Sequence, residues 1–203
     1  MLKAIFTACL MVLITLDSFS QELEYEIFVS DKHVGGILVT QKEISEEKVY
    51  YSAVTDVEYT LFKTTQLVYL YEAIYQNNVL ESSYFVHRKN GELIEEAKLQ
   101  RVHDSEKYIS NKNQQSETLE GLINRSMVQL YFTPPNARDS IFSERFHEYI
   151  KIAKLPDENK YMFEIPNGDK NIYEYNSEGI CTKIKVSSSF LKLEIILKPG
   201  GEK

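Results

Sequence analysis

Alternation of apolar and polar residues with a period of two runs through most of this chain, and helical spacing interrupts it only once. Over residues 23–29, apolar side chains at every second position are separated by Glu24 and Glu26. This spacing is typical of a β-strand with one buried face. Similar runs recur to the end of the sequence, divided by turn-forming pairs such as Asn77-Asn78 and Asn90-Gly91. The sequence therefore predicts a mainly β protein folded as an antiparallel meander.

The one helical segment lies between Gly121 and Pro135, where the chain reads GLINRSMVQLYFTPP. Its apolar residues recur at intervals of three and four, which places them on one face of a helix, and the two prolines then end it. We expect a short helix over about residues 119–132, packed against the sheet. A long run of sequential antiparallel strands tends to curl or close, so the expected architecture is a curved half-barrel or barrel.

Two further segments bear on the arrangement of the sheet. Residues 61–76 carry apolar side chains on both faces of a predicted strand, which indicates that the strand is covered on both sides and that the helix docks there. Residues 111–118 read NKNQQSET and contain no apolar side chain. We expect this polar stretch to form an exposed loop that leads into the helix.

The first twenty residues have the pattern of a secretory signal peptide. Lys3 supplies a positive charge, an apolar run follows, and small residues precede the expected cleavage site between Ser20 and Gln21. The apolar run is too short to span a membrane, and no second one follows, so no transmembrane segment is expected. The predicted protein is exported, either periplasmic or secreted, with one β-rich domain over residues 21–203.

The net charge limits which molecules this chain can bind, and the cysteine content limits which disulfides it can form. The formal net charge is −7, and no cluster of Lys and Arg is present, which argues against binding to nucleic acid. Cys9 lies in the signal peptide, so Cys181 is the sole cysteine expected after cleavage and has no partner for an internal disulfide. We interpret Cys181 as an ordinary strand residue.

The sequence offers no recognisable catalytic or metal-binding motif. The four histidines lack the spacing of a zinc site, although His87 and His103 can face each other across the turn between them. Ser126 does not lie in a nucleophile elbow, and a small hydroxyl on the inward face of a helix is typical of close packing. Glu95 and Glu96 alternate to opposite faces of one strand. We therefore predict no catalytic residues, no metal and no cofactor, and expect a protein that is not an enzyme.

Tyrosine is the most distinctive component of the predicted strands. Most of the tyrosines fall on inward faces, where their rings either form the core or line a cavity for an apolar ligand. Both alternatives remain open from the sequence. The candidate cavity-lining residues are Tyr51, Tyr59, Tyr69, Tyr71, Tyr75, Met127, Leu130 and Tyr131.

Three segments together resemble an uncharacterised family of exported β-rich proteins from Gram-negative bacteria. They are the GLINRSMVQLYFTPP segment, the SIFSERF segment that begins at Ser140, and the NIYEYNSEG segment that begins at Asn171. The resemblance covers about residues 22–198, and is sharpest at Ser126, at residues 130–132 and at Pro135. It implies a β-rich exported domain of unknown function and supplies no catalytic residues.

Three functional hypotheses follow from these observations. In the first, an exported binding domain without enzymatic activity holds a lipid or another apolar or amphiphilic molecule between the curved sheet and the helix. In the second, the same fold has a solid core and acts as an interaction or scaffold module of the cell envelope, with a protein partner that the sequence does not identify. A hydrolase is the third, and it requires a histidine joined to a carboxylate from a distant strand.

Overall fold

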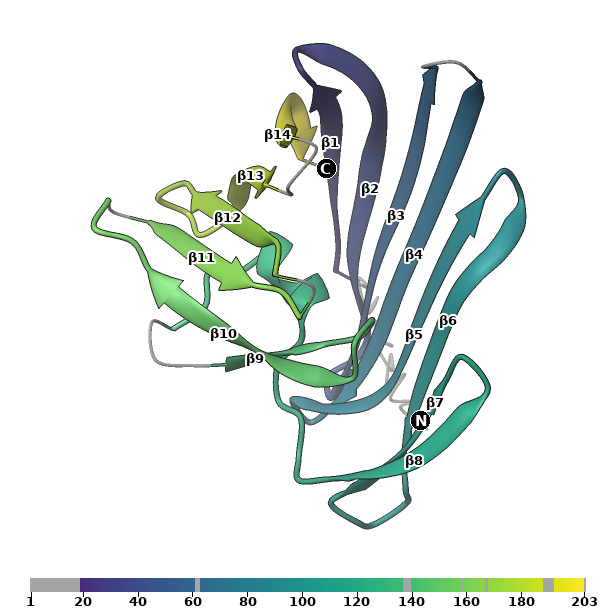
Figure 1. Ribbon diagram of the computed structural model, residues 1–203. Helices are drawn as coiled ribbons and strands as arrows, with labels where there is room; N and C mark the ends of the chain where they lie inside the picture. The colour runs from purple at the N-terminus through teal and green to yellow at the C-terminus, as the bar shows by residue number, and fades with distance from the viewer. Residues whose placement is uncertain are drawn as a thin grey trace, which may run out of the picture.

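The computed structural model describes residues 19–60, 63–136, 140–157, 159–166, 168–187 and 192–202. Within these ranges the chain forms one antiparallel sheet of 14 strands and one short 3-10 helix, η1 (Figure 1). The strands that precede η1 are β1 (Ser20–Val29), β2 (Lys32–Ser45), β3 (Lys48–Thr60), β4 (Thr64–Gln76), β5 (Val79–Lys89), β6 (Glu92–Arg101), β7 (Lys107–Lys112) and β8 (Gln115–Glu120). After them come η1 (Met127–Tyr131), β9 (Ser140–Ser143), β10 (Glu148–Lys154), β11 (Lys160–Glu164), β12 (Lys170–Tyr175), β13 (Cys181–Ser187) and β14 (Lys192–Glu202).

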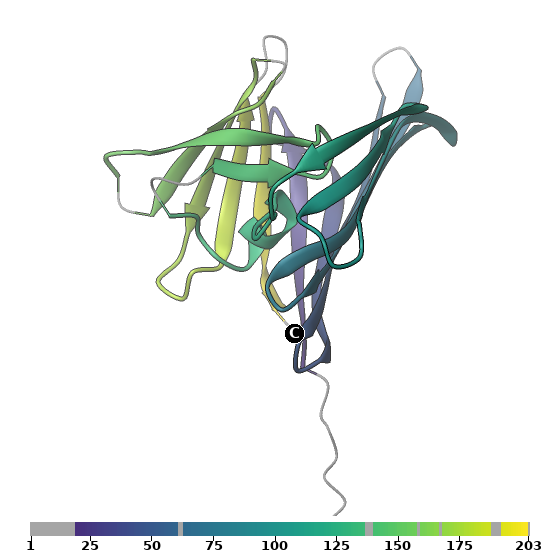
Figure 2. The ribbon, with the colours of Figure 1, turned by 90° about the horizontal axis from the view of Figure 1, so that it is seen from below.

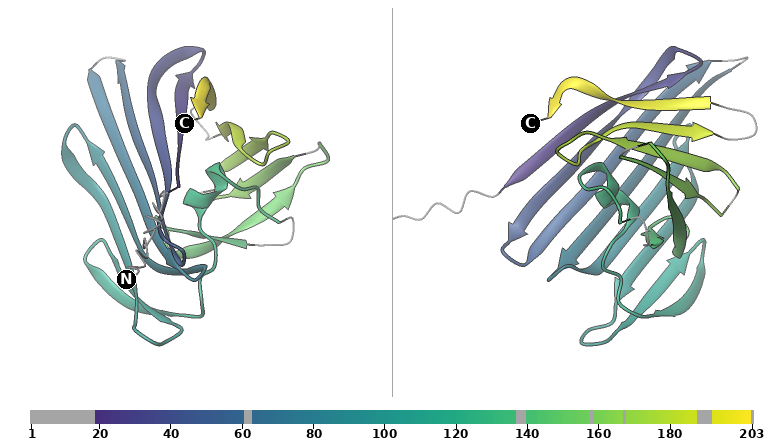
Figure 3. Two further views of the ribbon diagram at one scale, coloured as in Figure 1. Left: turned by 180° about the vertical axis from the view of Figure 1, so that it is seen from behind. Right: turned by 90° about the vertical axis from the view of Figure 1, so that its left-hand side faces the viewer.

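The sheet is a meander whose two ends in sequence meet at its centre. β1 pairs with β2 on one side and with β14 on the other, so the strand order runs from β8 through β1 and β14 to β9. We call β1–β8 the first wing and β9–β14 the second wing. The wings curve toward each other around η1, while β8 and β9 remain the two edges of an open sheet (Figures 2 and 3). The predicted antiparallel, curved, mainly β fold is confirmed, and the half-barrel rather than the closed barrel describes it.

The predicted helix is correct in place but wrong in length and type. Residues 119–120 still belong to β8, residues 121–125 have no regular structure, and only Met127–Tyr131 wind into a 3-10 helix. The irregular part is held by tertiary hydrogen bonds, because the Leu80 amide donates to the Ile123 carbonyl over 2.8 Å and the Phe142 amide to the Arg125 carbonyl over 3.3 Å. These contacts, which helical spacing does not reveal, use backbone groups that an α-helix would have paired internally.

The predicted loop over residues 111–118 is also wrong, because this segment forms the hairpin of β7 and β8. Its turn residues, Asn113 and Gln114, have φ angles of 47° and 69°, the left-handed conformation that two-residue hairpin turns require. β8 is exposed at nearly every position. Residues 115–118 of this edge strand are exposed and need no apolar side chain, which is why their sequence looks like a loop, whereas Leu119 packs against the core.

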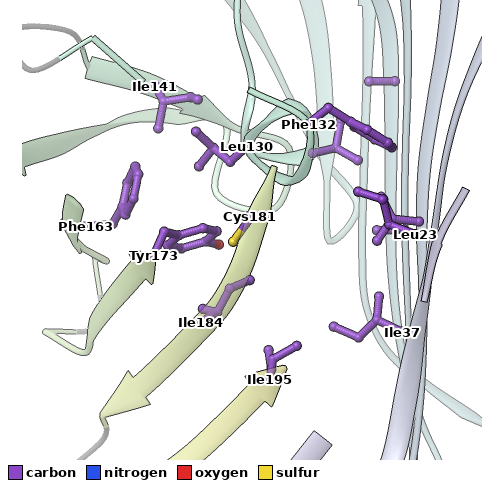
Figure 4. Close-up of a cluster of buried hydrophobic side chains, with 14 of the residues drawn as sticks. Leu23, Ile37, Leu130, Phe132, Ile141, Phe163, Tyr173, Cys181, Ile184 and Ile195 are labelled. Atoms are coloured by element: carbon purple, nitrogen blue, oxygen red, sulfur yellow. The ribbon is translucent and has the colours of Figure 1, made fainter. Parts of the chain in front are cut away.

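The core lies between the two wings, on the concave face of the sheet. One cross-strand row joins Leu23, Val39, Ala53, Tyr71 and Phe85, which pair in succession across five strands of the first wing. Four of these five side chains are at most 2% exposed, and Tyr71 is partly buried. From the second wing, residues such as Phe163, Tyr173 and Ile184 point into the same interior, with Leu130 of η1 between the wings (Figure 4). The alternation of apolar and polar residues in the sequence thus correctly predicts which side chains lie on the concave face.

Gly35 is required where β2 passes close to β3. A Cβ atom placed there would overlap the Asp56 carbonyl oxygen and lie 2.8 Å from the Val57 Cα atom. We expect Gly35→Ala to lower the free energy of unfolding by about 2 kcal/mol, since both neighbours are backbone and cannot turn aside. Gly91→Ala is the control, because Gly91 also has a positive φ but a Cβ added there would meet no atom within 4 Å. Equal losses of unfolding free energy in Gly35→Ala and Gly91→Ala, measured by chemical denaturation, would contradict this expectation.

The predicted signal peptide, residues 1–20, falls outside the described residues except for Phe19 and Ser20. Ser20 is already the first residue of β1 and pairs with Lys42. In the part of the chain that the structure describes, no helix has the length and apolar character needed to cross a membrane.

Candidate functional site

Five of the six candidate tyrosines lie on β3 and β4 and share the concave face. Register places Tyr51 and Tyr59 of β3 on the same side as Tyr69, Tyr71 and Tyr75 of β4. Side chains alternate between the two faces along each strand, and the pairing of β3 with β4 puts all five of these positions on one face. The other three candidates, Met127, Leu130 and Tyr131, lie on η1, which faces this side of the sheet. The fold therefore brings all eight candidates to one side of the first wing.

At one end of this face, the tyrosines and η1 form a solid core. The ring centroids of Tyr51 and Tyr75 lie 5.8 Å apart, those of Tyr51 and Phe132 lie 6.0 Å apart, and those of Tyr25 and Tyr131 lie 5.3 Å apart. Edge-to-face or tilted packing at these separations is favourable for aromatic rings. These ring contacts pack the segment of η1 against the sheet, and in Figure 4 Phe132 points toward the first wing while Leu130 points toward the second.

At the other end, where β3 meets β4 and β13 meets β14, the concave side chains remain partly exposed. These residues, which we call the distal surface, are Tyr59, Leu67 and Tyr69 on the first wing and Ile152, Val186 and Leu193 on the second wing. Pairing confirms that the second-wing residues share one row, since Leu193 pairs with Val186, Val186 with Asn171, Asn171 with Phe163, and Phe163 with Ile152. The distal surface is thus an apolar and aromatic face that solvent reaches.

Two surface pockets lie elsewhere in the described structure. One is on the outer, convex face over β3–β7 and the other is beside β13 and β14. None of the eight candidate residues lines either of them.

A polar turn between β9 and β10 joins the second wing to the first. Arg145 forms an ion pair with Glu95 of β6 at 2.9 Å, and His147 Nδ1 lies 2.6 Å from the hydroxyl of Ser110 on β7. Lys112 of β7 donates to the Phe146 carbonyl over 3.4 Å. We call Glu144–His147 the latch. It connects the wings on the side where no strand pairing closes the sheet.

The latch also holds η1 in place. Glu144 is completely buried, and its Oε1 atom accepts a hydrogen bond of 3.0 Å from the Val128 amide at the start of η1. Ser126, the residue before η1, is also buried and accepts a hydrogen bond of 2.7 Å from the Tyr75 hydroxyl. A carboxylate at the first turn satisfies an amide that the helix itself leaves unpaired.

Burial shifts the ionisation of both acidic and basic latch residues. It raises the pKa of the Glu144 carboxyl, and the Ser126 hydroxyl and the Val128 amide offset only part of that effect. It lowers the pKa of His147 to about 4, with the charge of Lys112 acting in the same direction. His147 is therefore neutral at pH 7, and its Nε2 atom has no hydrogen-bond partner among the described residues.

His87 is a basic group beside the distal surface. It pairs with Tyr69 across β4 and β5, and the two rings stack with centroids 4.4 Å apart. Its Nε2 atom is buried without a hydrogen-bond partner among the described residues. Burial and the neighbouring Arg145 lower the pKa of His87. His103, which the sequence allowed to face His87, instead lies in the turn after β6 and contacts Asp104.

The nucleophile candidates lie where substrate has no access. Ser126 and Cys181 are both 0% exposed, and burial raises the pKa of the Cys181 thiol well above its usual value. The pair of Ser110 and His147 has the distance of a nucleophile and its base, but Ser110 is also 0% exposed. Sequence reasoning missed this pair because residues on β7 and the latch are far apart in the chain. Among the described residues, no three His, Cys, Asp or Glu side chains gather in a way that can hold a metal ion.

The model of a domain of unknown function, DUF6134, matches residues 25–198. The chain belongs to this family. A search of curated proteins finds no match. Among solved structures, the chain is similar to a β-barrel-like protein of another domain of unknown function, DUF1849, from Brucella abortus, with a TM-score of 0.53 and 10% sequence identity over 88% of this chain and 95% of that one. At this identity, the likeness concerns the fold alone.

Proposed function

We propose that this chain is an exported binding domain without enzymatic activity, and that its distal surface holds the apolar part of an amphiphilic molecule such as a lipid. The observation that carries the proposal is the partial exposure of aromatic and aliphatic side chains on the concave side of both wings. Such a face, left uncovered beside a packed core, is typical of a surface that binds an apolar partner. At the opposite end of the concave face, η1 packs against the sheet, so the distal surface is the part of this face that remains uncovered.

Polar atoms beside the distal surface suit the head of an amphiphile. Tyr59 and Tyr69 combine an apolar ring with a hydroxyl group. Both side chains are partly exposed, so a ligand can reach them. In this proposal, the rings contact the chain of the ligand while the two hydroxyl groups hydrogen-bond its head.

Export and the absence of catalysis are parts of the same proposal. Export rests on the signal-peptide pattern of residues 1–20, with cleavage near Ser20 and Gln21. The absence of catalysis is supported by the complete burial of Ser110, Ser126 and Cys181. A general base has no accessible hydroxyl or thiol to activate at these positions.

The proposal is tested by purifying the processed protein from its native host and recording native mass spectra, with organic extraction of a parallel sample. We expect a bound species that dissociates on denaturation and appears in the extract as an amphiphile. A variant in which Leu67 and Tyr69 are replaced by Asp and Ser should carry much less of it, while a matched change of exposed Tyr149→Ser should not alter it. Empty protein in every preparation would contradict the proposal.

One observation favours the scaffold alternative. Leu38 and Val54 pair across β2 and β3 on the outer face and are 43% and 41% exposed. Exposed apolar neighbours of this kind also occur at protein–protein contacts. Under this alternative, the purified protein carries no amphiphile, and Leu38→Asp prevents co-purification of an envelope protein without affecting folding.

A further inference from the structure

A groove crosses the outer face of the first wing, on the side of the sheet away from the distal surface. Its volume is about 520 Å³, and its lining includes Tyr50, Glu72, Ile74, Tyr84, Lys98 and Gln100. Volumes of about 300–1,000 Å³ are usual for sites that bind small molecules. The groove spans β3 to β7 and is independent of the surface to which the proposed function is assigned.

Register explains why these side chains meet. Glu72 pairs with Tyr84 and Tyr84 with Lys98, so the three form one row across β4, β5 and β6 on the outer face. Tyr50 pairs with Ile74, which pairs with Ser82 in the adjacent row. Small or medium side chains thus lie between two tyrosines, and a change of register between Ile74 and Tyr75 interrupts the regular pleat at the same place.

The two tyrosines are fixed by their hydroxyl groups. Tyr50 donates a hydrogen bond of 2.6 Å to Glu72 Oε1, and Tyr84 donates one of 2.8 Å to Glu96 Oε1. Lys98 pairs with Glu96 at 3.0 Å and lies over the Tyr84 ring, 5.2 Å from its centroid. Rings that are already held in position lose little conformational entropy when a ligand binds.

The polar groups of the groove favour a neutral, hydroxyl-rich ligand over an ion. Among the described residues, Glu72 forms no ion pair, so an anion would meet an uncompensated carboxylate. The lining holds one carboxylate and one ammonium group, so it has no uniform charge that would select a cation. A carboxylate, an ammonium group and the amide of Gln100 together offer both acceptors and donors, which suits hydroxyl groups that act as either.

We propose that this groove binds a saccharide. The apolar face of a sugar ring lies against Tyr84, and its hydroxyls hydrogen-bond Glu72, Lys98 and Gln100. The site combines aromatic contact area with a few polar groups that fix orientation, as small-molecule sites generally do. In an exported protein, polysaccharide or glycan chains of the envelope are the source of such a ligand.

The test is a titration of the isotopically labelled mature domain with cellobiose, with N,N′-diacetylchitobiose and with sorbitol, followed by amide chemical shifts. We expect saturable changes at Ile74, Ser82 and Gln100 for at least one disaccharide, with a dissociation constant on the order of 1 mM, and none for sorbitol. Tyr84→Ala should weaken binding about tenfold or more, because it removes the aromatic surface.

One control variant and a second test variant keep the result interpretable. Tyr149→Ala removes another exposed tyrosine, on β10 of the second wing, and should leave the affinity unchanged. Glu72→Gln keeps the shape of the side chain but not its charge, and should weaken binding without unfolding the domain. The proposal is overturned if neither disaccharide gives saturable shifts, if the shifts are equal for sorbitol, or if they persist in Tyr84→Ala. Amphiphile binding to the distal surface would be unaffected by any of these outcomes.

Discussion

Replacing Glu144 by Ala is expected to lower the free energy of unfolding by about 3 kcal/mol. The side chain is fully buried, and its loss leaves the Val128 amide without an acceptor and a cavity beside η1. Glu144→Gln is expected to cost much less, because its amide oxygen can still accept from Val128 and no charge is buried. Denaturant unfolding at pH 7 measures both.

The matched control for this change is Glu148→Ala, which removes an exposed carboxylate four residues further along the chain. It should alter the free energy of unfolding by no more than about 0.5 kcal/mol. If Glu144→Ala unfolds at the same denaturant concentration as Glu148→Ala, then Glu144 does not hold η1. A loss in Glu144→Gln as large as in Glu144→Ala would show that the charge, rather than the acceptor, is required.

Stability is expected to fall as pH drops from about 6.5 to about 4, and His147 is the principal cause. Folding lowers the pKa of His147 from 6.5 to about 4, so the folded state binds its proton less readily than the unfolded state. The contribution of His147 to the free energy of unfolding is fully present above its pKa in the unfolded state and is lost as the pH falls toward its pKa in the folded state. At about 1.4 kcal/mol per pKa unit, the loss reaches about 3 kcal/mol.

The ionisable groups around His147 determine which comparison separates its contribution to the pH dependence of stability from theirs. Lys112 faces it from β7 and opposes its protonation, whereas burial of Glu144 in the same latch acts in the opposite sense. Because folding raises the pKa of Glu144, its contribution decreases as pH rises above the unfolded value. The comparison must therefore be made between variants at each pH rather than on the wild type alone.

The informative variant is His147→Asn, because asparagine tolerates the φ of 56° found at this position. It should be less stable than the wild type at pH 7, and the difference should shrink as the pH approaches 4. His103→Asn, at an exposed position in the turn after β6, should leave the pH profile unchanged. If the free energy of unfolding of His147→Asn depends on pH in the same way as that of the wild type, then another group causes the acid sensitivity.

Much of the fold follows from local patterns in the sequence. Alternation placed Tyr51, Tyr71 and Tyr75 on one face, and turn residues such as Asn77 and Asn90, both with positive φ, located the hairpins. It also separated Glu95, which contacts Arg145 on the concave side, from Glu96, which contacts Tyr84 on the outer side. These features depend on neighbouring residues, and sequence displays them directly.

The missed features depend on contacts between distant segments. η1 is short because Ile123 and Arg125 bond to strands, and β8 was mistaken for a loop because an exposed edge strand needs no apolar residue. The latch joins His147 to Ser110, 37 residues away. No periodicity or motif marks such a pair. The pairing of β1 with β14, which sets the order of the whole sheet, is likewise a contact between the ends of the domain.

A single tryptophan reports whether the distal surface binds the apolar part of an amphiphile, as we propose. The chain contains no tryptophan, so Tyr59→Trp introduces a unique fluorophore at the distal surface and Tyr149→Trp introduces one at an exposed position of β10. Titration with oleate or lysophosphatidylcholine below their micelle concentrations should give a saturable blue shift of emission in the first variant and none in the second. No shift at position 59, or equal shifts at both positions, would contradict the account.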